Sequence, residues 1–167
     1  MAGRLARGWA HLVNDARSLR RVFDDALLQR VEAAITGSER AHAAELRVAI
    51  EAALPLAQVW RGRTPRERAI EVFGTLGVWD TAANNGVLLY VLWADRAVEI
   101  VADRAAAAAI PQARWNEVCA TMASACRDGD VARGTMAAIA RIDQLLIEAF
   151  PAVDGDTDEL PNRPTLL

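Results

Sequence analysis

The chain has 167 residues, 53% of them apolar, and its formal net charge at pH 7 is −3. This length fits one domain, and the apolar content is sufficient for a core, which excludes a wholly disordered chain. The negative net charge argues against a nucleic-acid-binding protein, and the absence of lysine excludes lysine-based catalysis.

The sequence also argues against a membrane span, a signal peptide and a disulfide framework. No apolar run reaches the roughly 18 residues that cross a bilayer. Arg4 and Arg7 interrupt the first apolar stretch, which argues against a signal peptide. We therefore expect a cytoplasmic protein, at most peripheral to the inner membrane. Its two cysteines, Cys119 and Cys126, are too few for a disulfide framework or a structural zinc site.

Residues 1–23 are predicted to form a basic amphipathic N-terminal helix. This segment carries five arginines and a single carboxylate, Asp15. Its apolar residues recur at helical spacing and are Leu5, Trp9, Leu12, Ala16 and Leu19. Such a helix is typical of proteins that lie on an anionic membrane surface, and residues 4–21 are the candidate contact. The alternative is that this helix packs on the domain's own sheet.

Residues 24–150 are predicted to form an α/β domain, with a small mixed sheet and helices on both faces. Alternating apolar residues indicate a half-buried strand over 45–52, and an unbroken apolar run indicates a central strand over 86–93. Residues 97–103 then complete an antiparallel hairpin. A helix joins the first two strands, so these strands are expected to be parallel.

The connecting helix has a clear start signal. Thr64, Pro65 and Glu67 form a capping box with proline at the first helical position. The helix is expected to bury Ile70 and Phe73.

Two helices and an acidic tail follow the hairpin. Pro111 opens a helix whose apolar stripe contains both cysteines, which we interpret as core thiols. A cysteine-based phosphate loop would need arginine where the sequence has Ala132. The last helix stops at Pro151, and the tail over 151–167 is acidic, contains proline and is expected to be extended. Its run from Asp154 to Asp158 matches no calcium loop, so we interpret it as solvated.

The predicted strand order gathers polar residues at one edge of the sheet. Parallel strands begin at the same end, and an antiparallel neighbour finishes there. With Asp80 from the preceding loop, these residues, called the rim below, are His42, Glu45, Asp80, Asn84, Asn85, Asp103 and Arg104. Carboxylates, amides and an imidazole make the rim the best candidate for a hard-cation or phosphate site. The alternative is that polar residues simply gather at strand ends.

The opposite edge is an arginine-rich alternative suited to an anion. Its residues are Trp60, Arg61, Arg63, Asp95 and Arg96.

Several segments resemble a bacterial branch of the TPM domain family, the YgcG-like proteins. The segments Asn84–Tyr90 and Arg96–Arg104 are similar to the core of that family, and the closing Glu159–Pro164 is similar as well. The resemblance covers residues 24–150 and implies a Rossmann-like α/β/α sandwich whose functional end is the rim. Some members are described as acid phosphatases, some as calcium binders, and others as non-catalytic accessory proteins of membrane complexes.

The departures from the family pattern decide which function we expect. The family's D-N-G is Asn84-Asn85-Gly86 here, which removes one carboxylate. We therefore expect a non-catalytic binding or accessory module with a protein partner, acting at or near a membrane complex. The alternative that the resemblance implies is a weak divalent-metal-dependent phosphatase using Asp80, Asn85 and Asp103.

The same resemblance implies which ion and which ligands to test. Calcium or another divalent cation would be held by Asp80, Asn84 and Asp103, and calcium normally takes about six to eight oxygen ligands. Arg104 follows Asp103 directly and is predicted to close the rim by pairing with a nearby carboxylate. We therefore expect weak calcium binding or none.

Overall fold

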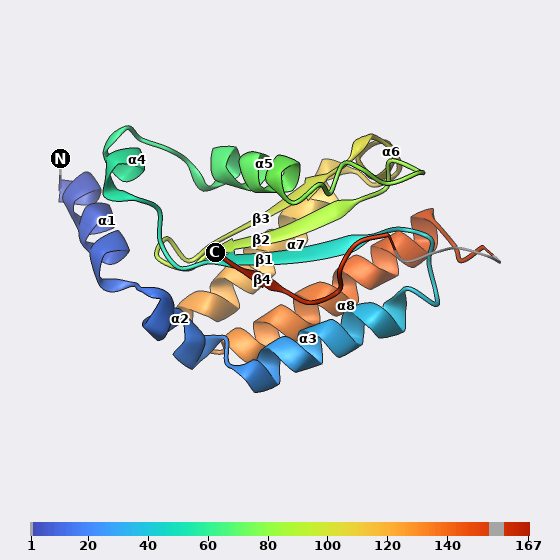
Figure 1. The fold of residues 1–167 in the computed structure, drawn as a ribbon, viewed down its shortest axis with the longest axis horizontal. Helices are drawn as coiled ribbons and strands as arrows, with labels where there is room; N and C mark the ends of the chain where they lie inside the picture. Colours follow the sequence, from blue (N-terminus) through green and yellow to red (C-terminus); the bar gives the residue numbers. More distant parts are fainter. Residues whose placement is uncertain (1, 154–158) are drawn as a thin grey trace.

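The computed structural model describes residues 2–153 and 159–167. A four-stranded mixed sheet, in the order β3-β2-β1-β4, lies between two layers of helices (Figure 1). The strands are β1 (Leu46–Glu51), β2 (Val87–Leu92), β3 (Ala97–Ala102) and β4 (Thr165–Leu166). The helices are α1 (Ala2–Val13), α2 (Ala16–Val22), α3 (Asp25–Ser38), α4 (Leu56–Trp60), α5 (Pro65–Thr75), α6 (Arg104–Ala109), α7 (Gln112–Arg127) and α8 (Val131–Ala149). The predicted α/β fold is confirmed.

The central strands pair as predicted. β1 and β2 are parallel, with Leu46 opposite Val87, and β2 and β3 form an antiparallel hairpin. β2 is buried along its whole length, which explains why its sequence shows no alternation. The capping box of Thr64 and Glu67 is present at the start of α5, the crossover helix between β1 and β2.

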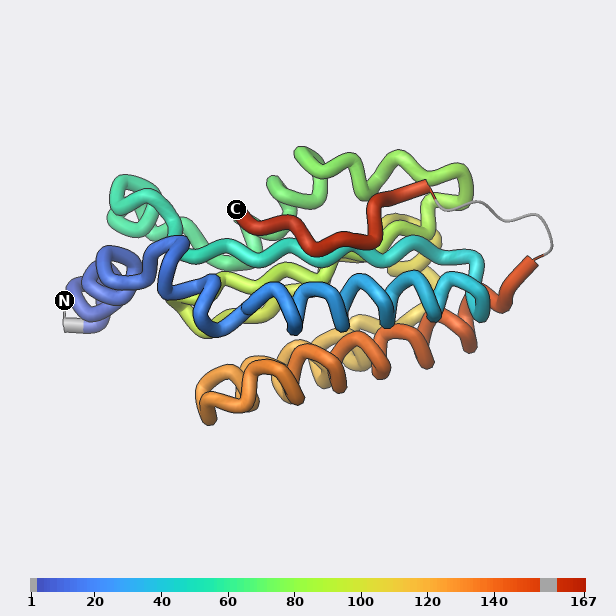
Figure 2. The backbone as a smooth tube through the Cα atoms, turned by 60° about the horizontal axis from the view of Figure 1, so that its bottom comes forward, coloured from blue at the N-terminus to red at the C-terminus, as the bar shows by residue number. Residues whose placement is uncertain are grey.

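Two apolar layers cover the two faces of the sheet. α3, α7 and α8 cover one face, and α5 covers the other (Figures 1 and 2). α7 and α8 pack closely at Gly134, where an added Cβ would lie 2.5 Å from the Cβ of Ala125. On α5, Ala69 and Val72 are buried and Ile70 is exposed, so the prediction that Ile70 is buried is wrong. No helix in residues 2–153 and 159–167 has the length and hydrophobicity needed to cross a bilayer.

The predicted single N-terminal helix is wrong, because the structure divides it into α1 and α2. The Asn14 side chain donates a hydrogen bond to the Ala10 carbonyl at 2.7 Å, at the end of α1. The Asp15 carboxylate accepts the Ser18 N–H at 2.8 Å and begins α2. Two adjacent polar side chains therefore end one helix and start the next.

The two helices of the N-terminal segment, α1 and α2, lie in different surroundings. Leu19 of α2 and Phe23 after it belong to the main core, and the Phe23 ring meets Trp93 edge-on with ring centroids 5.8 Å apart. α1 lies against α4 at one end of the molecule (Figure 1). The apolar residues predicted to form one stripe from Leu5 to Leu19 therefore lie on two separate helices, and these helices do not share one surface.

The tail contributes an edge strand that was predicted only as extended chain. Thr165 pairs in parallel with Ala49 of β1, and the tail runs alongside β1 (Figure 2). The guanidinium of Arg47 donates to the Pro161 carbonyl and, at 2.9 Å, to Thr165 Oγ1. The acidic run that was interpreted as solvated, residues 154–158, lies outside the described residues.

Candidate functional site

The structure brings the chain segments of the rim together through hydrogen bonds. The Asp103 N–H, after β3, donates to the Gly86 carbonyl at 2.8 Å, just before β2. The Asn85 side chain donates to the Ala43 carbonyl in the loop before β1. The three strand ends therefore meet at one edge of the sheet, as the topology predicts.

Gly86 allows this convergence. A Cβ at this position would lie 2.0 Å from the carbonyl oxygen of Val78 and 3.1 Å from its carbonyl carbon. Real Cβ atoms do not approach backbone this closely, so any other residue would push the loop after α5 away from the sheet. The glycine thus holds this loop against the rim.

Arg104 closes over Asn84. Arg104 Nη2 donates a hydrogen bond to Asn84 Oδ1 at 2.7 Å. Asn84 has a φ of 52°, in the left-handed region that asparagine tolerates better than most residues. Arg104 does bind across the rim, but the prediction that it pairs with a carboxylate is wrong, because its partner is the amide of Asn84.

Two buried oxygens at the rim have no hydrogen-bond partner within the described residues. They are Asn85 Oδ1 and Asp103 Oδ2, on side chains of residues that are 2% and 9% exposed. The other oxygen of Asp103 accepts the Arg104 N–H at 2.7 Å and caps α6. A buried acceptor without a donor costs free energy, so these two oxygens are suited to a donor or a hard cation.

The other predicted ligands serve different contacts. Glu45 is buried, and its carboxylate accepts the backbone N–H groups of Glu159 and Leu160 at 3.1 and 3.2 Å, which anchors the tail. Asp80 is exposed on the loop after α5, and its N–H donates to the Gly77 carbonyl. Within residues 2–153 and 159–167, no three or more His, Cys, Asp or Glu side chains cluster as a metal site would require. The metal ligands named from the sequence remain a prediction.

His42 lies against α8 on the core side of the rim. Its Nδ1 accepts the Ala44 N–H at 3.3 Å, and its Nε2 lies 3.9 Å from Asp143 Oδ1. This distance is too long for a direct hydrogen bond. Within the described residues, the buried Nε2 of His42 therefore has no hydrogen-bond partner.

At the opposite edge, Asp95 belongs to a partly buried cluster whose members from α1 the sequence analysis did not identify. Asp95, in the turn between β2 and β3, accepts hydrogen bonds from Arg7 at 2.8 to 3.1 Å and from His11 Nε2 at 3.0 Å. The Leu54 N–H donates to His11 Nδ1 at 2.9 Å, so the proton of the neutral ring is on Nε2. Burial opposes ionisation of Asp95, but the bonds from Arg7 and His11 outweigh it and hold its pKa below the ordinary value.

This cluster and its neighbours occupy most of the predicted anion site. Arg63 pairs with Glu71, and the Arg96 guanidinium lies 3.3 Å from the centre of the Trp93 ring. No sequence pattern joins α1 to the hairpin, because the partners are more than 80 residues apart along the chain.

A second buried network lies between β1 and α5. The Tyr90 hydroxyl donates to Glu51 Oε2 at 2.6 Å, and Arg68 donates to both oxygens of Glu51 at 2.9 and 3.0 Å. Burial, together with the bond to Glu51, raises the pKa of Tyr90. Because its members bind one another beneath α5, the network fastens this helix to the sheet.

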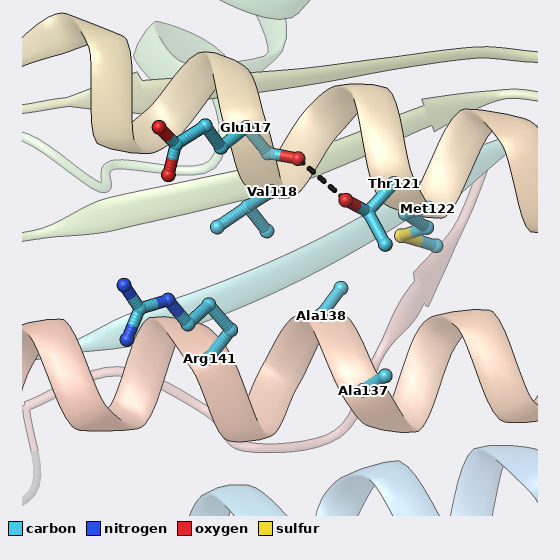
Figure 3. A pocket seen from close by; sticks show the side chains of 7 residues that line it. All are labelled: Glu117, Val118, Thr121, Met122, Ala137, Ala138 and Arg141. Atoms are coloured by element: carbon cyan, nitrogen blue, oxygen red, sulfur yellow. Dashed lines mark hydrogen bonds between the residues drawn. The ribbon is translucent and has the colours of Figure 1, made fainter.

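A cavity of about 270 Å³ opens between α7 and α8 (Figure 3). Glu117 and Arg141 place opposite charges at the same end of it, one from each helix. The Thr121 hydroxyl donates to the Glu117 carbonyl at 2.9 Å, within its own helix. The rest of the lining is apolar, and it offers a binding surface without a nucleophile.

The thiols are core groups, as predicted. Cys126 is buried, and burial raises the pKa of Cys119 to about 11. Burial also raises the pKa of Cys126, so the surroundings of neither thiol favour the thiolate that a nucleophilic cysteine needs.

The comparisons with known proteins agree with this architecture. The chain matches the TPM domain over residues 17–145. The NMR structure of the BA42 protein from the psychrophilic bacterium Bizionia argentinensis is similar, with a TM-score of 0.74 and 25% sequence identity. That similarity covers 85% of this chain and 93% of the BA42 chain. The search of curated proteins gave no match. Because the domain match extends over most of the sequence and includes every element of the rim, the chain belongs to the TPM domain family.

Proposed function

We propose that this protein is a non-catalytic binding module that serves a protein partner at or near a membrane complex. The observation that carries the proposal is the hydrogen bond from Arg104 to Asn84 at the rim. The resemblance implies a carboxylate at position 84, and this chain has a neutral amide there, held by an internal guanidinium. A rim closed in this way is better suited to a fixed interaction surface than to turnover.

The remaining rim chemistry supports the same proposal. Metal-assisted phosphoryl transfer needs charged oxygen ligands around an open coordination position. Glu45 is used to hold the tail, Asp80 is exposed, and Asp103 caps α6 with one of its oxygens. The positive charge of Arg104 beside Asp103 also opposes the binding of a cation.

A second candidate function is a weak divalent-metal-dependent phosphatase that uses Asp80, Asn85 and Asp103. The unpartnered oxygens Asn85 Oδ1 and Asp103 Oδ2 favour it, because both are buried and both are suited to a hard cation. Binding of the cation would have to move Arg104 away from Asn84. The candidate therefore predicts activity that rises when Arg104 is removed.

Turnover of a generic phosphomonoester separates the two functions. The assay is run without metal and with calcium, magnesium or manganese, on the wild type, Arg104→Ala and Asp103→Asn. We expect no turnover above buffer in any of them. Asp130→Asn, a change in an exposed carboxylate at the start of α8, serves as the control. Metal-stimulated turnover that Asp103→Asn abolishes and Asp130→Asn leaves intact would establish the phosphatase.

A further inference from the structure

α1 presents its apolar side chains to solvent and its polar side chains to the protein. Leu5, Trp9 and Leu12, one helical face, are 61%, 66% and 59% exposed. His11 is 5% exposed and is bound to Asp95. A surface helix of a globular protein normally has the reverse arrangement, with its apolar stripe on the core.

The orientation of α1 is fixed by specific contacts. Arg7 donates to both oxygens of Asp95 and to the Arg63 carbonyl, and His11 bridges Asp95 and the Leu54 N–H. Rotating α1 to bury its apolar face would break all of these bonds and expose a carboxylate that they now satisfy. The exposed apolar face is therefore a built feature of the fold.

α4 extends this face into a larger patch. Leu56 and Trp60 of α4 are also exposed, and a cavity of about 210 Å³ opens between the two helices. The residues of this patch, called the α1–α4 surface below, are Leu5, Gly8, Trp9, Leu12, Leu56 and Trp60. It lies at one end of the molecule, where α1 and α4 project beyond the sheet (Figures 1 and 2).

Positive charge accompanies the α1–α4 surface. Arg4 donates a hydrogen bond to the Trp60 carbonyl, and Arg61 directly follows Trp60 and is exposed. Within the described part of the chain, the arginines on α1, on α2 and directly after α4 that form no salt bridge are Arg4, Arg17, Arg20, Arg21 and Arg61. A single carboxylate, Asp15, stands among the first 23 residues.

We propose that the α1–α4 surface docks on an anionic lipid bilayer. Leucines suit the acyl boundary, tryptophans suit the headgroup level, and unpaired arginines attract anionic lipid. An uncharged partner groove would match the apolar side chains and leave the arginines without counter-charges. The proposal rests on the proposed placement near a membrane. It narrows the membrane contact predicted for residues 4–21, because Leu19 and the rest of the core-facing side of α2 cannot take part.

Co-sedimentation with lipid vesicles tests the proposal. The probes are vesicles of phosphatidylcholine containing phosphatidylserine, and vesicles of phosphatidylcholine alone. We expect the wild type to bind the anionic vesicles and to be released by salt, because screening weakens the arginine attraction. The double variant Leu5→Gln, Trp9→Gln should bind at least about tenfold more weakly, because its apolar contact is removed.

Two further variants make the result specific. Trp79→Gln changes a tryptophan that is 55% exposed elsewhere, and it should leave vesicle binding unchanged. Arg61→Gln, at an exposed position, should weaken binding to anionic vesicles about fivefold, the effect of one arginine near such a surface. Thermal unfolding of each variant shows whether the fold is kept, and Arg61→Gln keeps the test valid if the α1 variant is unstable.

Three results would overturn the proposal. The first is the absence of wild-type binding to anionic vesicles, and the second is an equal loss of binding in Trp79→Gln. The third is a dimer that Trp9→Gln dissociates, without any vesicle binding, which would assign the α1–α4 surface to a second copy of the chain. None of these results bears on turnover at the rim, so they leave the test of the proposed function intact.

Discussion

Arg104 Nη2 lies 2.7 Å from Asn84 Oδ1, so a side chain at the start of α6 is hydrogen-bonded to the loop that precedes β2. This contact places a positive charge at the rim where a cation would have to bind. Two arrangements of the rim can therefore be distinguished by experiment. In one, Arg104 is bound to Asn84, and in the other, Arg104 has moved away and a metal ion can bind.

The first prediction concerns calcium. Wild-type protein should bind it weakly or not at all, and Asn84→Asp alone should change this little, because Arg104 would pair with the new carboxylate. Asn84→Asp combined with Arg104→Ala should tighten binding by about tenfold or more, since ligand charge tunes calcium affinity over decades. Calorimetric titration of chelator-treated protein measures this. Tight stoichiometric binding by the wild type that Asp103→Asn removes would show an intact metal site.

The second prediction concerns Gly86. Gly86→Ala should destabilise the protein by about 2 kcal/mol, because its Cβ would overlap the Val78 carbonyl and the backbone must shift. The control is Gly74→Ala, on α5, where a Cβ meets no atom within 4 Å and helix propensity favours alanine by about 1 kcal/mol. Chemical denaturation of both variants gives the two free energies of unfolding. Equal effects would show that the contact with Val78 does not constrain position 86.

The third prediction concerns pH and Asp95. Its pKa is lowered in the folded state, so its contribution is present above the ordinary carboxyl value of about 3.9 and is lost as pH falls through the folded value. Asp95→Asn should cost about 2 kcal/mol at pH 7, because charged hydrogen bonds to Arg7 and His11 are lost. The difference in unfolding free energy between wild type and variant should shrink on acidification. A difference that stays constant down to pH 2 would contradict the assignment.

The fourth prediction concerns Arg68. Arg68→Met should cost about 3 kcal/mol, because the buried Glu51 carboxylate would keep only the Tyr90 hydroxyl as a side-chain partner. Arg66→Met, on the same helix, removes a partly exposed pair with Glu99 at 3.6 Å and a hydrogen bond to the Ile100 carbonyl, and it should cost only about 1 kcal/mol. Thermal unfolding compares the two variants. Similar losses would indicate that helix content, and not the buried network, sets the stability of α5.

The sheet was predictable because its signals are local. The unbroken apolar run of β2 indicates a strand covered on both faces, and the capping box at Thr64 marks the start of the crossover helix. Together these features order β1, α5 and β2 and bring the strand ends to one rim. The position of Asn84 next to Arg104 follows from that order, although the partner of Arg104 had to be read from the structure.

The contacts that were missed depend on long separations in sequence. Asp95 meets Arg7 across 88 residues, and a helical stripe cannot show that the polar side of α1 is the one that packs. Arg47 likewise finds the tail across more than 110 residues. Ile70 was assigned to the wrong face because adjacent helix positions lie about 100° apart, so a one-residue error in phase exposes it.

The tail over residues 159–167 has a consequence for how the protein behaves in a crowded solution. Leu167 N–H donates to the Ile50 carbonyl at 2.9 Å, so the short β4 and its neighbours occupy hydrogen-bonding groups on the outer side of β1. Without this segment, β1 would offer an apolar, unpaired edge, which is a template for strand exchange between molecules. The tail therefore covers this edge, and the carboxylate of Glu45 and the guanidinium of Arg47 bind it in place.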